Sequence, residues 1–220
     1  MIATTTSQSR PSQRSLGVTT QRDRGLIVEL QRALSMPDAV LHDRLVERAG
    51  RAGLLDVAYR TVASPVGELL LAATPLGLVR IAFEREDHEA VLARLAADVS
   101  PRILRDPRRL DAAARQLEQY FAGRRRRFAL PIDLQLAGGF RRTVLTHLQD
   151  IPYGTTASYG TVAAAAGKPA AVRAVGSACS HNPLPVVVPC HRVVRSDGTL
   201  GQYLGGPAAK RTLLSMESTA

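Results

Sequence analysis

The sequence predicts a mixed α/β (α+β) protein, in which a small antiparallel sheet with helices precedes a helical domain. Between Val57 and Glu84, alternating and β-branched apolar runs are separated by turn sequences. From Phe140 onward, apolar residues recur at helical spacing, and two short helices are joined by a tight turn that contains glycine. A chain of 220 residues is long enough for two such domains, each with its own core.

The first 54 residues stand apart from this pattern. Residues 1–24 are rich in Ser, Thr, Gln and Arg and have no aliphatic run, which predicts a disordered tail. Residues 25–54 carry apolar residues at helical spacing with a break at Pro37, which predicts a short extension of two helices. No motif in this extension indicates a function.

Residues 55–137 are expected to form the first domain. Three strands are predicted, at residues 59–62, 68–72 and 78–83, with turns at 64–67 and 74–77. Two helices follow, at about residues 89–97 and 109–121. The basic run Arg124–Arg127 after them is compatible with a phosphate contact and equally with a solvated charge cluster.

Residues 138–220 are expected to form a second, helical domain. Helices are predicted at residues 140–149, from about 156, and at 170–180. The last two have the helix-turn-helix shape, which is often only a packing unit. The second of them offers small side chains and a single Arg173, which suits close approach to a minor groove better than base reading in a major groove. The alternative is a buried Ala/Val helix with one surface arginine.

Charge and hydropathy narrow the class of protein. The net charge is +10, and residues 138–220 carry eight basic against three acidic side chains, which fits a polyanionic partner such as DNA. Basic surfaces without a specific partner are also common. No apolar run reaches the roughly 18 to 20 residues that cross a bilayer, and no secretory signal begins the chain. We therefore expect an intracellular, cytoplasmic protein that does not interact with membranes.

The cysteine and histidine content argues against a disulfide framework and a metal site. Cys179 and Cys190 are the two cysteines, and the five histidines are scattered without metal-ligand spacing. No metal and no cofactor are expected.

The segment Val186–Val194 carries the most reactive combination of residues in the sequence. An apolar run leads to Cys190, which is followed by His191 and Arg192. Burial would raise the pKa of this thiol, whereas a nearby base or cation would lower it. In an extended segment, neighbouring side chains point to opposite faces, so a water molecule between thiol and imidazole is the simplest link.

A carboxylate on the far nitrogen of the imidazole would fix its tautomer. Asp150, Asp197 and Glu217 are the candidates in the C-terminal region. The alternative interpretation is a core cysteine beside an incidental histidine.

The motif Pro189-Cys-His-Arg-Val-Val194, within Asn182–Val194, strongly resembles the active-site motif of the O6-alkylguanine-DNA alkyltransferases, the methylated-DNA–protein-cysteine methyltransferases. The resemblance runs from about Phe140 to Glu217 and includes Ile151-Pro-Tyr-Gly154, Ser158-Tyr159, Arg173-Ala-Val-Gly176 and Tyr203-Leu-Gly-Gly206. It implies a ribonuclease H-like N-terminal α/β domain followed by a winged helix-turn-helix-like domain. It also implies suicide repair of O6-alkylguanine, and of O4-alkylthymine, in double-stranded DNA without a cofactor.

The resemblance implies a role for each matching residue. Cys190 would accept the alkyl group, His191 would deprotonate it through water, Glu217 would polarise the imidazole, and Asn182 would brace the preceding turn. Arg173 would fill the gap left by the flipped nucleotide, and Tyr159 would rotate and hold the base. The small residues Ala171, Ala174 and Gly176 would lie against the DNA. The guanine pocket would be lined by Tyr159, Pro185, Val193, Tyr203, Leu204 and Gly205.

The chain departs from the family pattern at a few positions. Leu145 stands where the family often has Trp, and Leu204 replaces a small polar residue of some members. Cys179 is expected to be a packing residue. A monomer is expected, with cooperative binding along DNA left open. Two rival functions are a non-reactive sensor of alkylated bases, against which the retained Cys190 argues, and an unrelated cysteine hydrolase.

Overall fold

The structure, a computed structural model, describes residue 25 and residues 37–218. The chain divides into two units, residues 1–45 and 46–220, and the helix α2 (Asp38–Arg51) spans the boundary. This helix accounts for the second half of the predicted extension, and none of its residues is buried. The predicted tail and the first predicted helix of the extension lie outside the described residues, except for residue 25.

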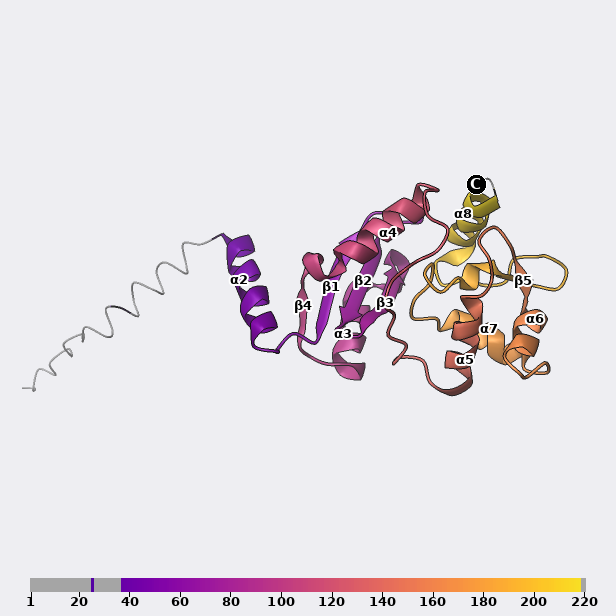
Figure 1. The fold of residues 1–220 in the computed structure, drawn as a ribbon, viewed down its shortest axis with the longest axis horizontal. Helices are drawn as coiled ribbons and strands as arrows, with labels where there is room; N and C mark the ends of the chain where they lie inside the picture. The colour runs from indigo at the N-terminus through magenta and orange to yellow at the C-terminus, as the bar shows by residue number, and fades with distance from the viewer. Residues whose placement is uncertain (1–24, 26–36, 219–220) are drawn as a thin grey trace, which may run out of the picture. The chain divides into compact units, whose positions relative to one another are not determined.

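A four-stranded sheet forms the first part of the larger unit (Figure 1). Its strands are β1 (Val57–Val62), β2 (Leu69–Thr74), β3 (Gly77–Phe83) and β4 (Ile103–Arg105), in the order β3-β2-β1-β4. The pairs β1–β2 and β2–β3 are antiparallel, which confirms the predicted meander, whereas β4 pairs with β1 in parallel. The sequence did not predict β4, because three residues are too few to show a period.

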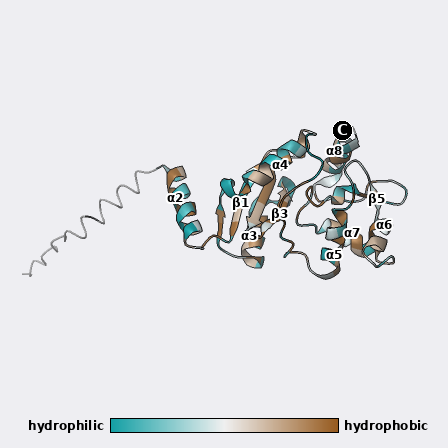
Figure 2. Ribbon diagram, viewed as in Figure 1, coloured by the Kyte–Doolittle hydropathy of each residue, from teal (hydrophilic) through white to brown (hydrophobic). Residues whose placement is uncertain are grey.

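Both faces of the sheet are apolar, and each is covered by a helix. Along β2, Leu69 and Leu71 pack into the core that contains α4 (Asp111–Phe121), while Leu70 and Ala72 pack into the core that contains α3 (His88–Asp98). Side chains of a strand alternate between its two faces, so neighbours enter different cores. In Figure 2, the brown of hydrophobic residues is visible in β1 and β3. A 3₁₀ turn at Pro107–Leu110 leads into α4, where a longer helix was predicted.

The second part of the larger unit is helical, as predicted (Figure 1). Its helices are α5 (Gly139–Leu148), α6 (Tyr159–Ala165), α7 (Val172–Ser180) and α8 (Gly206–Ser218). Two short strands, β5 (Ala157–Ser158) and β6 (Val193–Val194), pair in parallel. The predicted start near residue 156 is corrected to Tyr159, because the Ser158 side chain caps α6 by accepting from the Thr161 amide at 3.0 Å.

The segment around Cys190 is not the extended strand that the sequence suggested. Cys190–Arg192 form a single 3₁₀ turn, and only Val193–Val194 are extended. The turn is closed by the Arg192 amide, which donates to the Pro189 carbonyl at 3.0 Å. Val186, before it, has a φ of 74°. A β-branched residue rarely adopts this conformation, so the packing around the loop must hold it there.

The edge of the sheet supports the loops of the helical part. The β3 residue Ile81 donates its amide to the Pro183 carbonyl at 2.8 Å. The Phe83 ring lies edge-on to Tyr203, with centroids 5.6 Å apart. A Cβ added at Gly205 would stand 2.7 Å from this ring, so only glycine permits the close approach. The sheet therefore fixes the two loops on either side of the Cys190 turn.

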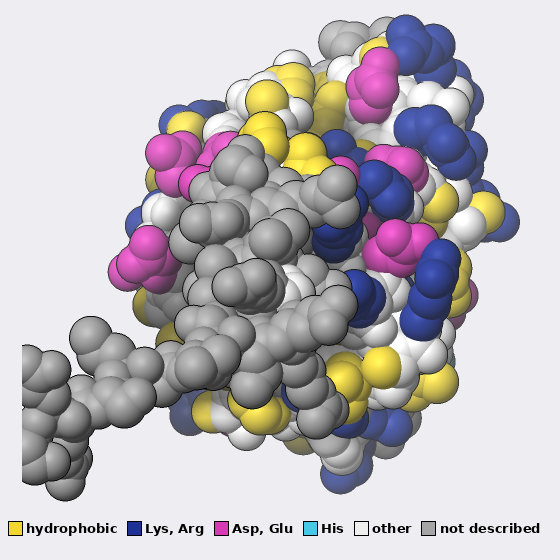
Figure 3. All heavy atoms as spheres, turned by 90° about the vertical axis from the view of Figure 1, so that its left-hand side faces the viewer, with side chains coloured by type: hydrophobic (Ala, Val, Ile, Leu, Met, Phe, Trp, Pro, Cys, Tyr) yellow, Lys and Arg dark blue, Asp and Glu magenta, His cyan; other side chains and the backbone are white. Residues whose placement is uncertain are grey.

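Basic side chains are mixed with acidic ones on the face shown in Figure 3. Ion pairs of the first part include Arg102 with Asp56 at 2.7 Å and Arg60 with Asp111 at 2.7 Å. Part of the positive charge is therefore locally balanced there. Among the described residues, no helix is long and apolar enough to span a bilayer.

A matched pair of leucine variants tests this packing. Leu71 is fully buried in β2, whereas Leu76 is 73% exposed in the following turn. We expect Leu71→Ala to lower the free energy of unfolding by about 2–5 kcal/mol, because it leaves a cavity in the core. Leu76→Ala should change it by less than about 0.5 kcal/mol. Urea denaturation measures both, and equal losses would contradict the described core.

Candidate active site

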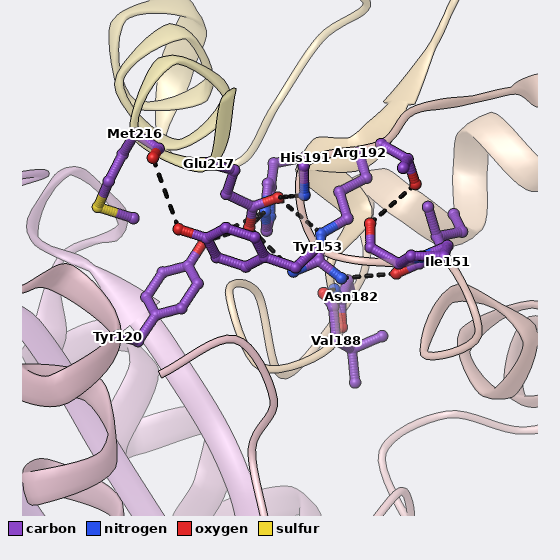
Figure 4. Close-up of polar contacts among 12 residues, drawn as sticks. Tyr120, Ile151, Tyr153, Asn182, Val188, His191, Arg192, Met216 and Glu217 are labelled. Carbon is purple, nitrogen blue, oxygen red and sulfur yellow. Dashed lines mark hydrogen bonds and ion pairs between the residues drawn. The ribbon is translucent and has the colours of Figure 1, made fainter. Parts of the chain in front are cut away.

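A buried carboxylate lies at the centre of the candidate site (Figure 4). Oε1 of Glu217, on α8, accepts hydrogen bonds from the Tyr120 hydroxyl at 2.6 Å, from His191 Nε2 at 2.9 Å and from Arg192 Nη2 at 2.9 Å. Oε2 accepts from Arg192 Nε at 2.9 Å and from the Gly154 amide at 3.2 Å. Burial alone would raise the pKa of Glu217, but the hydrogen bonds from His191 and Arg192 hold this pKa well below its usual value. The carboxylate is therefore ionised at neutral pH.

The glycine of the Ile-Pro-Tyr-Gly motif fits this arrangement for a steric reason. Gly154 has a φ of +76°, and a Cβ added to it would lie 3.0 Å from the Glu217 carbonyl oxygen. A side chain here would be strained and would push α8 away, so glycine lets the amide reach the carboxylate.

His191 is oriented by Glu217. An ionised carboxylate only accepts, so the contact assigns the proton to Nε2 and leaves Nδ1 as an acceptor. Nδ1 is buried and has no hydrogen-bond partner in the part of the chain that the structure describes. Burial lowers the pKa of His191, although the hydrogen bond and charge of Glu217 act in the opposite direction. The imidazole is therefore neutral at rest and can take up a proton at Nδ1.

The thiol of Cys190 is 2% exposed and directly contacts Asn182. Burial raises the pKa of Cys190 to about 11, while the Asn182 hydrogen bond and the charge of Lys210 act to lower it. The distance from Asn182 Nδ2 to Sγ is 3.1 Å. At neutral pH the resting thiol is thus protonated, and its reaction as a nucleophile requires a base.

Asn182 also holds the loop before the turn Cys190–Arg192, which we call the reactive turn. Its side chain is fully buried, donates to the Val188 carbonyl at 2.8 Å and accepts from the Leu184 amide at 2.9 Å. These bonds span the residues between α7 and Cys190. Such bonds are what the predicted bracing of this turn requires.

The structure distinguishes among the three predicted carboxylates. Glu217 contacts His191, as described above. Asp150 lies 3.6 Å from His147 Nδ1, and Asp197 accepts from the Thr199 amide at 2.9 Å. Both aspartates are exposed, so they are wrong as candidates for the partner of His191.

The sequence did not reveal the contacts of three further residues of the site. Tyr120 comes from α4, far away in sequence, and nothing local marks it. Arg192 was noticed beside His191 but not as the bidentate partner of Glu217. Lys210 is fully buried and donates to the Val193 carbonyl at 2.6 Å. Its spacing of seven residues from Glu217 places both on one face of α8, and this signal could have revealed it.

The predicted pocket residues surround the reactive turn in part. Pro185 and Val193 are buried, and the Tyr203 ring lies edge-on to His191 with centroids 6.3 Å apart. The Tyr203 hydroxyl is buried and has no hydrogen-bond partner among residues 37–218. Tyr159 contacts the loop that leads to Tyr203, because a Cβ at Gly201 would lie 2.2 Å from the Tyr159 hydroxyl oxygen. The predicted pocket residues Leu204 and Gly205 follow Tyr203 directly, and Leu204 also lines a cleft of about 330 Å³ beside Asn182.

Helix α7 presents the surface that the sequence predicted, with small side chains and a single charged one. Arg173 and Ala174 are exposed, while Ala171 and Gly176 are half-buried. The opposite face of α7, with Val175, packs into the core. The rival interpretation of a buried helix is thus correct for one face only.

No group of three metal-ligating side chains is present among the described residues. The two cysteines are free thiols.

Comparison with known proteins decides the family. Residues 57–134 match the model of the ribonuclease-like domain of 6-O-methylguanine DNA methyltransferase. Residues 139–219 match the model of its DNA-binding domain. The chain belongs to the 6-O-methylguanine DNA methyltransferase family. This membership confirms the expected resemblance and the two-part fold.

Individual members of the family show the same relation. The methylated-DNA–protein-cysteine methyltransferase of Mycolicibacterium paratuberculosis is 41% identical over 161 residues, which are 73% of this chain and 92% of the relative. The constitutive enzyme of that name from Bacillus subtilis is 38% identical over 160 residues, 72% of this chain and 94% of the relative.

Solved structures of the family agree with this assignment. The O6-methylguanine methyltransferase of Mycobacterium tuberculosis has a TM-score of 0.66 at 39% identity, covering 74% of this chain and 93% of that one. A crystal structure of the M. tuberculosis protein in complex with DNA has a TM-score of 0.64 at 38% identity, with the same coverage. The family models begin at residue 57, so the N-terminal extension lies outside them.

The buried carboxylate predicts a specific dependence of stability on pH. At pH 7, Glu217→Gln should lower the free energy of unfolding by about 3–5 kcal/mol, because it leaves the Arg192 charge buried without its counterion. A carboxyl whose pKa is lower in the folded state contributes stability above its ordinary value of 4.5. This contribution is lost as the pH falls from 4.5 toward the folded-state pKa. The difference between parent and variant should therefore shrink below pH 4.5.

Denaturation curves at pH 7, 5 and 3.5 would measure this difference. Asp197→Asn is the matched control, because Asp197 is exposed in a turn and should change stability little at any of these values. A gap between parent and Glu217→Gln that is constant with pH would contradict the ionised, paired state of Glu217.

Proposed function

We propose that this chain repairs DNA directly, by irreversible transfer of an alkyl group from O6 of guanine to its own Cys190. One observation supports this function most strongly. In the domain that matches the family's DNA-binding model, a buried thiol adjoins a histidine whose Nε2 is held by an ionised carboxylate and whose Nδ1 has no partner within the described part of the chain. The same chemistry extends to O4-alkylthymine, which presents an alkyl carbon on a comparable ring oxygen.

The proposed reaction follows from the protonation states of these groups. The Cys190 proton passes through a water molecule to Nδ1 of His191, and the imidazolium that forms is stabilised by the negative charge of Glu217. The thiolate attacks the alkyl carbon, the bond between that carbon and O6 breaks, and the electron pair stays on guanine. A donor near the ring, for which we propose the Tyr159 hydroxyl, stabilises this leaving group.

The product explains why the protein would act only once. A thioether at Cys190 is not hydrolysed by any of the neighbouring side chains described above. Each protein molecule therefore repairs one lesion, and no cofactor takes part.

The exposed surface of α7 would bring the lesion to the thiol. We assign Arg173 to the gap that the flipped nucleotide leaves, and Tyr159 to the rotation of the base. Ala171, Ala174 and Gly176 would allow the helix to approach a minor groove closely. Extrusion of a base costs a few kcal/mol in lost stacking, which the inserted arginine and the pocket contacts would offset.

The pocket for the flipped guanine would lie between the loop at 203–205 and the reactive turn. We assign its apolar walls to Pro185 and Tyr203, and its remaining lining to Val193, Leu204 and Gly205. Asn182 would keep the turn in place during the reaction. The partner is double-stranded DNA that contains alkylated bases, bound by a monomer in the cytoplasm at the nucleoid.

The two rival functions fit the site less well. A sensor that binds the lesion without reacting has no use for the Cys190–His191–Glu217 arrangement. A cysteine hydrolase would need a second step that releases its covalent intermediate, and an exposed arginine on a helix of small residues would have no role in it.

The mass of the protein after reaction tests the proposal. Incubation with a duplex that contains O6-methylguanine should add one methyl group to the peptide that carries Cys190, with saturation at one equivalent. Cys190→Ser should gain nothing, while Cys179→Ser, the matched control at the second buried thiol, should react like the parent. Tight lesion binding without a mass change would instead support a sensor, and continued turnover of an ester would support a hydrolase.

A second test separates base flipping from chemistry. Arg173→Ala should slow repair of an alkylated duplex by about 10- to 100-fold, because the gap in the stack is no longer filled. The same variant should react at the parental rate with the free base O6-benzylguanine, which needs no flipping. Equal losses with both substrates would contradict the role assigned to Arg173.

A further inference from the structure

The ribonuclease-like domain contributes one hydroxyl group to the candidate site. Tyr120, on α4, is fully buried, and its hydroxyl donates to Oε1 of Glu217 at 2.6 Å (Figure 4). Its ring contacts those of Phe121, Phe128 and Tyr153, with centroids 5.2 to 6.1 Å apart. The hydroxyl therefore reaches the carboxylate from within an aromatic cluster.

This hydroxyl is a permanent donor. Burial, followed by the negative charge of Glu217, raises the pKa of Tyr120 far above its ordinary value. Tyr120 therefore stays protonated while His191 titrates, and it acts as a donor to the carboxylate in both protonation states of the imidazole.

Tyr120 and His191 share the same acceptor atom. Oε1 of Glu217 lies 2.6 Å from the Tyr120 hydroxyl and 2.9 Å from His191 Nε2, and the two donors are themselves 3.4 Å apart. A carboxylate oxygen that already accepts a short hydrogen bond offers less negative charge to a second donor. The hydrogen bond from Tyr120 therefore weakens the stabilisation that Glu217 can give to a protonated His191.

We propose that Tyr120 is a positioning residue that acts through Glu217 to limit the basicity of His191, and so restrains the ionisation of the resting Cys190 thiol. The proposal rests on the transfer chemistry proposed above. The ribonuclease-like domain thereby adjusts the reactivity of a thiol that belongs to the other domain.

The sign of the effect follows from linkage. The Tyr120 hydrogen bond is stronger while His191 is neutral, because Glu217 then has more charge to share, and so it disfavours protonation of the imidazole. Its removal should raise the pKa of His191. Each half unit of this rise shifts the proton transfer from Cys190 to His191 by about threefold toward the ion pair.

The other charged and titratable groups near His191 are the same with and without the Tyr120 hydroxyl. Arg192 and Lys210 disfavour the imidazolium, whereas Glu217 favours it. Cys190 precedes His191 in the same turn, and the Tyr203 ring lies 6.3 Å from the imidazole. Removal of one hydroxyl leaves all of them in place.

Such a restraint suits a protein that can react only once. A thiol that is ionised at all times would be consumed by any small electrophile before it met a lesion. A base held below its full strength keeps the thiol protonated in the free protein, while the proton can still move when a substrate is in place.

The variant Tyr120→Phe keeps the ring and removes the hydroxyl. In protein labelled with ¹⁵N-histidine, we expect its His191 to titrate with a pKa higher than the parent's by about half a unit or more. Tyr153→Phe is the matched control, because the Tyr153 hydroxyl donates to the Met216 carbonyl at 3.5 Å and not to the carboxylate. It should leave the titration of His191 unchanged.

A ring-fluorinated tyrosine at position 120 tests the same idea in the other direction. Its hydroxyl is more acidic and a stronger donor, so the pKa of His191 should fall. A purely structural role of Tyr120 would not produce opposite shifts in the two variants, and the fluorinated protein keeps the test valid should Tyr120→Phe fail to fold.

Repair assays complete the experiment. At pH values above the pKa of His191, where the imidazole of the free protein is neutral, Tyr120→Phe should transfer methyl from an O6-methylguanine duplex about threefold faster than the parent. An unchanged or lowered pKa of His191 in Tyr120→Phe, or the same rise in Tyr153→Phe, would overturn the proposal. A parent that leaves the lesion untouched while His191 titrates as expected would refute the repair function but leave the coupling intact.

Discussion

The buried, ionised carboxylate of Glu217 is the constraint on which the rest of this structure depends. A charge removed from water is costly unless hydrogen bonds and a counterion replace the lost hydration. Here five donors do so, from a helix of the ribonuclease-like domain, from the turn at Gly154 and from the reactive turn itself. The carboxylate therefore ties together elements that are up to 97 residues apart in the sequence.

This constraint also underlies the proposed chemistry. Because Glu217 accepts a hydrogen bond from the protonated Nε2 of His191, the other ring nitrogen, Nδ1, is left as an acceptor. The thiol that requires a base belongs to the preceding residue, Cys190. The 3₁₀ turn, rather than a strand, brings the side chains of Cys190, His191 and Arg192 into this arrangement. The sheet matters because Ile81 and Phe83 hold the loops on both sides of that turn.

Local patterns predicted much of this organisation. The alternating runs between Val57 and Phe83 predicted the meander, and the helical periods placed α3, α5 and α7 within two residues of their bounds. The residues around Cys190 indicated the family, which the comparison with known proteins confirms, whereas the reacting groups that they predict remain a proposal. Tyr120 could not be found in this way, because its role depends on a contact between domains. The turn at Cys190 was also missed, since its short apolar run has the pattern of a strand, whereas contacts such as those of Asn182 and Pro189 fold it otherwise.

The tautomer of His191 reports on whether the ionised Glu217 carboxylate orients the imidazole. In ¹⁵N-histidine-labelled protein at neutral pH, long-range ¹H–¹⁵N spectra distinguish the protonated ring nitrogen from the bare one. We expect that Nε2 of His191 carries the proton and that Nδ1 is bare, with this pattern lost in Glu217→Gln. A proton on Nδ1 in the parent protein would contradict it, because the imidazole could then not receive the proton of Cys190 at that atom.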